Sequence, residues 1–236
     1  MPPTAVLIRH AQALHNIHDP PLSGLGFGPQ CQELSKHLEE SVPLAQKIDL
    51  IVISPMRRTL QTATQSLGWL IDRGVPVLLA PLWQENSSNP CDTGTPIPIM
   101  REEWPQFDWD AVDPLYPAKS GIYSFSKKGL GERGREARRW LKNRPEQVIA
   151  VVSHSAFLKV GVSNKRFYNA DYRVFEFKED GEGRGDGEDR LVEWEETETR
   201  GGGLGKSGFG MYFLGPGCYP KESETPAEEV LDGAGG

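Results

Sequence analysis

Ala5-Val6-Leu7-Ile8-Arg9-His10 is a short apolar run that ends in a cation and an imidazole, and it indicates how the rest of the chain is built. An aliphatic run of this length is typical of a buried strand. A second such run, residues 148–152, ends in Ser153-His154. Open α/β sheets bind ligands beyond the carboxyl ends of their strands. We therefore expect the two histidines, with nearby arginines, to form one site that attacks or binds an anion.

Strand and helix patterns alternate along most of the chain. They predict strands at about 5–8, 50–53, 75–79 and 148–152, and helices at about 31–42, 55–71 and 130–142. In the second helix, Ser54 is the expected N-cap and Pro55 the expected first helical residue. Strands that alternate with helices imply right-handed crossovers. The predicted fold class is therefore α/β, a three-layer α/β/α sandwich around a mainly parallel central sheet.

Three segments depart from this alternation. Residues 86–130 are rich in Pro, Trp and Asp without periodicity, which favours an irregular cap insertion over the site. Residues 172–177 and 191–194 predict a hairpin at a sheet edge, joined by a charged loop. We expect a catalytic domain over residues 1–198 and a Gly/Pro/Glu-rich, largely disordered tail over residues 199–236.

Charge and composition narrow the function classes. The chain has 236 residues and a formal net charge of −7, which argues against nucleic acid or a membrane surface as partner. An anionic substrate must then be attracted by a local cluster of arginines. No apolar run is long enough to span a bilayer, and the first strand begins too early for a signal peptide. With three cysteines in no metal or disulfide spacing, we expect a cytoplasmic protein, or one that is also nuclear. The sequence predicts no oligomeric state.

The strand ends and loops carry the groups that phosphoryl transfer needs. The reaction requires a nucleophile in line, cations around the equatorial oxygens and a proton for the leaving oxygen. Neutral imidazole is a nucleophile near neutral pH, and neighbouring cations lower its pKa. Arginine binds phosphate bidentately. A carboxylic acid supplies the proton. The chain has no Gly-Lys-Ser/Thr phosphate loop, so nucleotide-driven transfer has no support.

Four segments together resemble one protein family. Residues 7–16, 54–63, 82–85 and 153–155 are similar, in the same order, to the motifs of the histidine phosphatase superfamily, the phosphoglycerate mutase-like proteins. The resemblance covers roughly residues 5–178. A Cys-Asp-Thr-Gly segment at residues 91–94 is similar to a stretch in fungal-type phosphatase members.

The resemblance implies a role for five residues. His10 would be the nucleophile that becomes phosphohistidine, and Glu85 the acid that protonates the leaving alcohol and then helps water to attack. Arg9, Arg58 and His154 would bind the phosphoryl oxygens. Arg58 matches the family arginine better than its neighbour does, because it lies four residues after the motif serine.

Four further residues are expected to bind substrate. Asn16 would donate to the phosphate, and Ser23 and Ser155 lie in segments similar to family motifs. Gln12 either lines the pocket or lies at the surface. The family glycine after the catalytic histidine is Ala11 here, which an extended segment tolerates. Three basic residues of the cap either bind a second anionic group of the substrate or lie at the surface: Arg101, Lys119 and Lys127.

The implied function is a metal-independent phosphomonoesterase that needs no cofactor and hydrolyses a small phosphorylated metabolite. The alternatives are a phosphoglycerate mutase-type transfer, and a catalytically silent member that binds a phosphorylated ligand or a protein. The segment between Glu85 and His154 is shorter than in the mutases, which favours access of water and hence hydrolysis. The sequence does not identify the metabolite.

Overall fold

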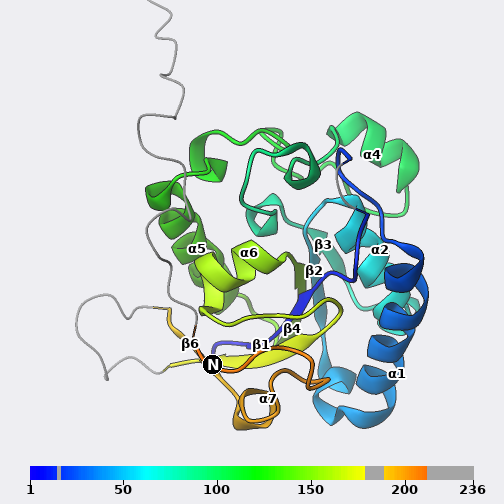
Figure 1. The fold of residues 1–236 in the computed structure, drawn as a ribbon, viewed down its shortest axis with the longest axis vertical. Coiled ribbons are helices and arrows are strands. Elements are labelled where there is room, and N and C mark those ends of the chain that lie inside the picture. Colours follow the sequence, from blue (N-terminus) through cyan, green and yellow to red (C-terminus); the bar gives the residue numbers. More distant parts are fainter. Residues whose placement is uncertain (15–16, 179–188, 212–236) are drawn as a thin grey trace, which may run out of the picture.

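A six-stranded sheet forms the centre of the molecule (Figure 1). The computed structural model describes residues 1–14, 17–178 and 189–211. The strand order is β3-β2-β4-β1-β5-β6, and the first four strands in that order are parallel. β5 runs antiparallel to β1, and β6 antiparallel to β5. The strands are β1 Thr4–Arg9, β2 Leu50–Ile53, β3 Val77–Leu79, β4 Val148–Ser153, β5 Tyr172–Phe177 and β6 Leu191–Glu193.

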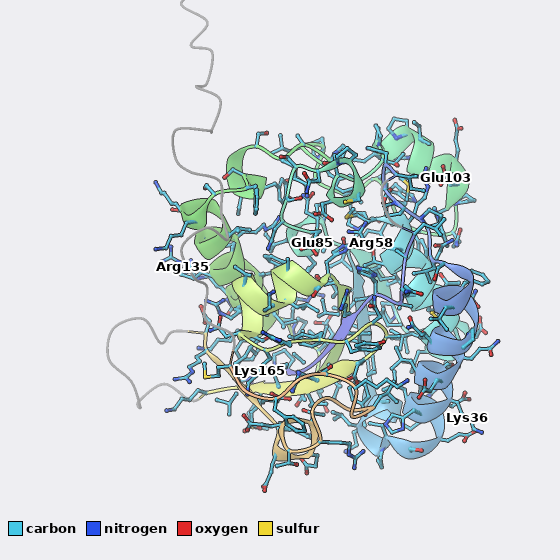
Figure 2. The ribbon with its side chains drawn as sticks, in the orientation of Figure 1. Lys36, Arg58, Glu85, Glu103, Arg135 and Lys165 are labelled. Atoms are coloured by element: carbon cyan, nitrogen blue, oxygen red, sulfur yellow. The ribbon has the colours of Figure 1, made fainter. Side chains whose placement is uncertain are left out.

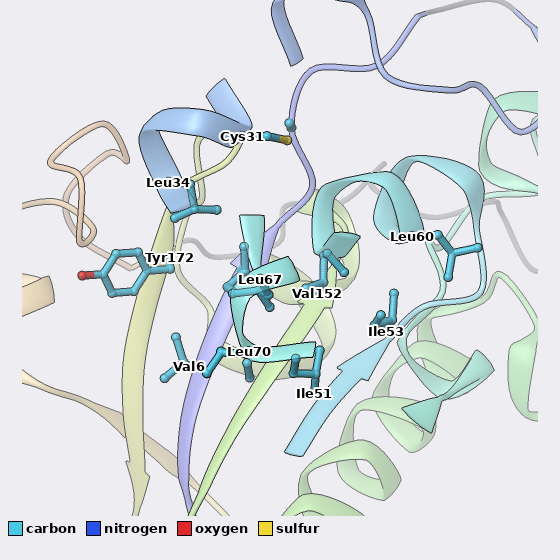
Figure 3. Close-up of a cluster of buried hydrophobic side chains, with 14 of the residues drawn as sticks. Val6, Cys31, Leu34, Ile51, Ile53, Leu60, Leu67, Leu70, Val152 and Tyr172 are labelled. Atoms are coloured by element: carbon cyan, nitrogen blue, oxygen red, sulfur yellow. The ribbon is translucent and has the colours of Figure 1, made fainter. Parts of the chain in front are cut away.

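Helices cover both faces of this sheet, which confirms the predicted three-layer α/β/α sandwich. Successive strand residues point to opposite faces, so Val6 and Val152 belong to one buried cluster and Leu7 and Val151 to the other. The first cluster packs under α1 Cys31–Ser41, α2 Arg57–Ser66 and α3 Gly68–Asp72 (Figure 3). The second packs under α5 Lys127–Lys142, α6 Ser155–Phe157 and the turn η6 Leu158–Ser163. Strands buried on both faces explain the unbroken apolar runs of the sequence.

The predicted start of the second helix is wrong. α2 begins at Arg57 with Met56 as its N-cap, because the residues expected to start the helix have other partners. The Ser54 hydroxyl is hydrogen-bonded to His154, and the carbonyl of Pro55 accepts from the Tyr116 hydroxyl at 2.7 Å. At its other end the predicted helix divides into α2 and α3 at Leu67.

The cap insertion consists of loops and short helical turns. They are η4 Pro90–Asp92, α4 Ile97–Glu103 and η5 Gly121–Tyr123. Buried Asp19 ties the cap to the start of α2, because its carboxylate accepts from the backbone N–H groups of Thr95 at 3.1 Å and Arg57 at 3.2 Å. α5 begins at Lys127, earlier than predicted, because Ser126 caps it by accepting from Gly129 N–H at 3.0 Å. The remaining short helical segments are η1 Gly26–Gln30, η2 Pro43–Lys47 and η3 Pro81–Trp83.

The folded chain continues past the predicted domain boundary at residue 198. After α7 Glu195–Glu198, the chain wraps around buried Asp171, whose carboxylate accepts from the backbone N–H groups of Leu204 at 2.9 Å and Ser207 at 2.9 Å. Residues 199–211 are therefore packed, contrary to expectation, because a buried carboxylate needs these donors. The antiparallel β5–β6 pair at the sheet edge is as predicted; its loop at 179–188 and the tail at 212–236 lie outside the described residues. Within the described ranges, no helix combines the length and apolar character needed to cross a bilayer.

α5 approaches the segment beneath it so closely that one position requires glycine. A Cβ added at Gly134 would collide with the carbonyl oxygen of Gly161 in η6, whereas a Cβ added at Gly131 meets nothing within 4 Å.

Gly134→Ala is expected to lower the free energy of unfolding by about 1–3 kcal/mol, because the helix must move away from η6. Gly131→Ala, on the exposed side of the same helix, is the control and is expected to be neutral or stabilising by up to about 1 kcal/mol. Urea denaturation of both variants measures the difference. Equal effects of the two substitutions would contradict the close approach.

Candidate active site

The topology places the two strand-end histidines next to each other. β1 and β4 are neighbouring parallel strands in which Arg9 pairs with Ser153, so His10 and His154 follow at the same edge. Their ring centroids are 5.2 Å apart. Both are buried, with His10 8% and His154 0% exposed. The structure therefore brings the two histidines together at one edge of the sheet.

Hydrogen bonds define the tautomer of each ring. His10 Nδ1 lies 2.7 Å from the Ala11 carbonyl oxygen, which only accepts, so Nδ1 carries the proton. His154 Nε2 lies 2.8 Å from Ser54 Oγ. Arg58 Nε–H donates both to His10 Nε2 and to His154 Nδ1, each at 3.2 Å. Each of these two nitrogens therefore presents a lone pair toward the same point.

The environment of His154 favours its neutral form. Burial lowers the pKa of this imidazole well below its ordinary value, and the positive charges of Arg58 and of nearby Lys119 and Arg133 lower it further. A neutral His154 can accept from Arg58 at one nitrogen while it donates to Ser54 through the other.

Arg58 reaches the histidines from the first turn of α2, and the cap orients it. Its Nη1 donates to the Cys91 carbonyl oxygen at 2.7 Å, and its Nη2 lies 3.5 Å from an oxygen of Asp92. Neighbouring Arg57 points away and pairs with Glu103, with 2.8 Å between Nε and Oε2. Successive helical residues lie about 100° apart around the axis, which separates the two arginines.

Arg9 brings a second guanidinium to the site. Its Nη1 donates to the Phe167 carbonyl oxygen at 2.9 Å. Burial lowers the pKa of Arg9, as does the charge of Arg58, whereas the carboxylate of Glu85 raises it. These interactions place Arg9 within electrostatic range of both groups.

Glu85 lies under the cap, on a loop that follows β3. Its Oε1 accepts from the backbone N–H groups of Asn86 and Phe157, each at 2.9 Å, and its Oε2 accepts from Ala156 N–H at 3.1 Å. The carboxylate is therefore held over the segment that follows His154. Figure 2 shows Glu85 and Arg58 in the interior, between the sheet and the cap.

The predicted substrate-binding residues have other surroundings. Ser23 Oγ donates to the backbone and side-chain carbonyl oxygens of Gln12, both at 3.1 Å, so these two side chains hold a loop together. Ser155 is half-buried at the start of α6. Asn16 lies outside the described residues. Ala11 is not among the described residues with positive φ, so the family glycine is replaced without strain.

Sequence reasoning missed two partners of the site. Ser54 was assigned to a helix cap, although it hydrogen-bonds to His154. Arg133 is fully buried beside Glu85. The sequence could have indicated this, because Arg133 lies at helical spacing in the apolar stripe formed by Leu130, Ala137 and Leu141. Lys119, named only as a candidate cap cation, donates from Nζ to the Glu85 carbonyl oxygen at 2.6 Å. Burial lowers its pKa to about 7. In the described part of the chain, no three His, Cys, Asp or Glu side chains gather as a metal site.

The fold and the site define an α/β domain in which imidazoles at the ends of two neighbouring strands share one guanidinium donor. A model of the histidine phosphatase superfamily (branch 1) matches residues 5–173, and the chain belongs to this family. This confirms the family on which the predicted enzyme class rests.

Similar proteins agree with this assignment. A probable phosphatase of Schizosaccharomyces pombe is 31% identical over 169 residues, 66% of this chain and 76% of that protein. A phosphoglycerate mutase-like protein of Arabidopsis thaliana is 27% identical over 199 residues, 66% of this chain and 72% of that protein. The ecdysone phosphate phosphatase of Bombix mori, solved with tungstate, superposes with a TM-score of 0.51 at 14% identity, over 78% of this chain and 98% of that chain. At that identity the likeness shows the shared fold.

Burial of neutral His154 makes stability depend on pH. Its pKa is lower in the folded than in the unfolded chain, so the unfolded chain takes up the proton first as pH falls. The folded state therefore keeps its full stability at pH values above the unfolded-state pKa of about 6.5, and its free energy of unfolding falls as the pH drops below that value. Between about pH 7.5 and about pH 5.5, wild type is expected to lose about 1.4 kcal/mol more than His154→Gln, which cannot titrate.

Urea denaturation at both pH values measures this loss, and His18→Gln, at an exposed position, serves as the control. Parallel pH dependences for wild type and His154→Gln would contradict the buried neutral imidazole.

Proposed function

We propose that this protein is a phosphomonoesterase that hydrolyses a small phosphorylated metabolite through a phosphohistidine on His10, without a metal ion. The observation that carries the proposal is the shared Arg58 Nε–H, which lies 3.2 Å from His10 Nε2 and 3.2 Å from His154 Nδ1. It marks a point where a nucleophilic lone pair, a cation and a neutral imidazole face one another. A phosphoryl group that replaces His10 as the acceptor of this N–H would lie against Nε2.

In the first step, the His10 Nε2 lone pair attacks phosphorus and forms the P–N bond while the ester P–O bond breaks. The electron pair of the broken bond goes to the leaving oxygen, which takes the proton of the Glu85 carboxyl. Nδ1–H bonded to the Ala11 carbonyl stabilises the positive charge that develops on the ring. Arg9 and Arg58 compensate the charge of the equatorial oxygens.

In the second step, water attacks the phosphorus of phosphohistidine. Glu85, now a carboxylate, takes a proton from the water. The P–N bond breaks and its electron pair returns to His10 Nε2. One ester and one water are converted into one alcohol and one inorganic phosphate, and the enzyme returns to its starting state.

Relatives and surroundings favour hydrolysis. The Schizosaccharomyces pombe relative is named a probable phosphatase. Arg9, Lys119 and Arg133 lie within electrostatic range of Glu85, and Arg58 lies between the two histidines. These basic groups provide local positive charge in a chain of net charge −7, as an anionic substrate requires. His10 and Glu85 are only 8% and 6% exposed. This limited access favours a small phosphorylated substrate over a bulky one.

Wild type is expected to release inorganic phosphate from members of a phosphomonoester panel, and His10→Ala to lose at least about a thousandfold in rate while its circular dichroism spectrum is unchanged. The protein should acquire acid-labile phosphate during turnover, measured by acid and base treatment after quenching. A matched His18→Ala variant should keep full activity. Isomerised phosphoglycerate without phosphate release would support a mutase, and the absence of acid-labile phosphate would contradict the covalent route.

Glu85→Gln is expected to slow hydrolysis of alkyl phosphates by about 10²–10⁴-fold, because their leaving oxygen needs a proton. p-Nitrophenyl phosphate, whose leaving group departs unprotonated, should lose much less in the bond-breaking step. Quenched-flow measurement of phosphoenzyme formation with both substrates separates the two cases. Equal losses of rate with the two substrates would contradict the assignment of Glu85 as the proton donor.

A further inference from the structure

Arg133 on α5 is a fully buried cation outside the set of residues that face the phosphoryl group. Its side chain is 0% exposed. Nη2 donates to Asn86 Oδ1 at 2.6 Å, and the guanidinium carbon lies 4.2 Å from the centroid of the Phe157 ring. Its Nε and Nη1 have no hydrogen-bond partner among the described residues.

Asn86 and Phe157, the hydrogen-bond and ring partners of Arg133, also hold Glu85. The backbone N–H groups of Asn86 and of Phe157 donate to the same carboxylate oxygen, Oε1, each at 2.9 Å. The opposite oxygen, Oε2, accepts only the longer bond from Ala156, at 3.1 Å, among the described contacts. Arg133 therefore contacts both residues whose N–H groups fix Oε1 of Glu85. Oε2 is held by fewer donors and can exchange a proton more easily.

Burial of this charge is costly, and that cost points to a role. Desolvation lowers the pKa of Arg133 to about 10, and the carboxylate of Glu85 opposes that shift. No ion pair of Arg133 at contact distance occurs in the described structure. A buried cation without a contact partner destabilises a protein. An apolar residue at this position of the buried stripe would avoid that cost.

Three cations face Glu85 from three different elements. Arg9 approaches from β1, Lys119 from the cap and Arg133 from α5. Arg9 also donates to a carbonyl oxygen, and Lys119 donates to the backbone of Glu85 itself. Among these three cations, it is Arg133 that contacts both Asn86 and Phe157, the residues that donate to Oε1.

We propose that Arg133 is a positioning residue for acid–base catalysis: it holds Asn86 and Phe157 so that Oε1 of Glu85 is saturated and Oε2 is the oxygen that carries and transfers the proton. The inference rests on the proposed role of Glu85. In the first step, the proton leaves Oε2 for the leaving oxygen as the P–O bond breaks, and in the second step Oε2 takes a proton from water. Arg133 itself exchanges no proton and does not contact the phosphoryl group.

The test compares Arg133→Met, Arg133→Lys and the control Arg135→Met, whose side chain is exposed on the same helix (Figure 2). Each variant is assayed for phosphoenzyme formation with glycerol phosphate and with p-nitrophenyl phosphate. Arg133→Met should lose about 10–100-fold with glycerol phosphate, because a misplaced acid costs rate steeply, and less than about threefold with p-nitrophenyl phosphate, with KM unchanged. Arg133→Lys keeps the charge but loses the planar group over Phe157, so the same selective loss should be about 3–10-fold. Arg135→Met should match wild type.

Equal losses with both substrates, or none with either, would overturn the inference. If circular dichroism shows that Arg133→Met does not fold, Arg133→Lys tests the inference by the same comparison of glycerol phosphate with p-nitrophenyl phosphate. In the Glu85→Gln background, Arg133→Lys should cause no further loss with glycerol phosphate, since the acid is already gone. If Glu85→Gln shows no substrate selectivity, the proton-donor role of Glu85 in the proposed function fails; if it does and Arg133→Lys does not, only the role of Arg133 fails.

Discussion

The site depends on one hydrogen-bond donor, the Nε–H of Arg58, which two imidazoles from neighbouring strands share. A single N–H with two acceptors holds both rings with their lone pairs converging. This requires both histidines to be neutral at the converging nitrogens, and the surroundings enforce it. The Ala11 carbonyl fixes the proton of His10 on the far side of the ring, and burial favours the neutral form of His154. The folded chain thus presents the lone pair of His10 Nε2 toward the shared donor.

Basic side chains outnumber carboxylates around the site. Arg9, Lys119 and Arg133 lie near Glu85, while Arg58 lies near Asp92, and Arg58 and Arg133 are deeply buried. Uncompensated buried charge destabilises the folded chain. Under the proposed function, a bound phosphate dianion would add negative charge here and would stabilise this region.

The cap does more than cover the site. Its backbone carbonyl at Cys91 and its carboxylate at Asp92 orient Arg58, while Asp19 and Tyr116 tie it to the segment just before α2. The same segment carries Ser54, the partner of His154. A change in the cap therefore reaches Arg58 through two direct contacts, with the Cys91 carbonyl and with the Asp92 carboxylate.

The local pattern along the chain was enough to predict the strands and the layers, because apolar periodicity indicates burial. It also predicted that the groups after β1 and β4 lie together, because the carboxyl ends of parallel strands meet at one edge of the sheet. The resemblance to the histidine phosphatase motifs favoured Arg58 over Arg57, and the folded chain places Arg58 at the two histidines. The local pattern could not supply the strand order, which puts β4 between β1 and β2 and so joins His10, Ser54 and His154. Nor could it supply the partners of buried polar groups: the hydroxyl that looked like a helix cap, the residues at 199–211 that enclose Asp171, and Arg133 beneath Glu85. Each of these depends on a partner distant in sequence, and a buried donor or acceptor selects its partner only when the chain is folded.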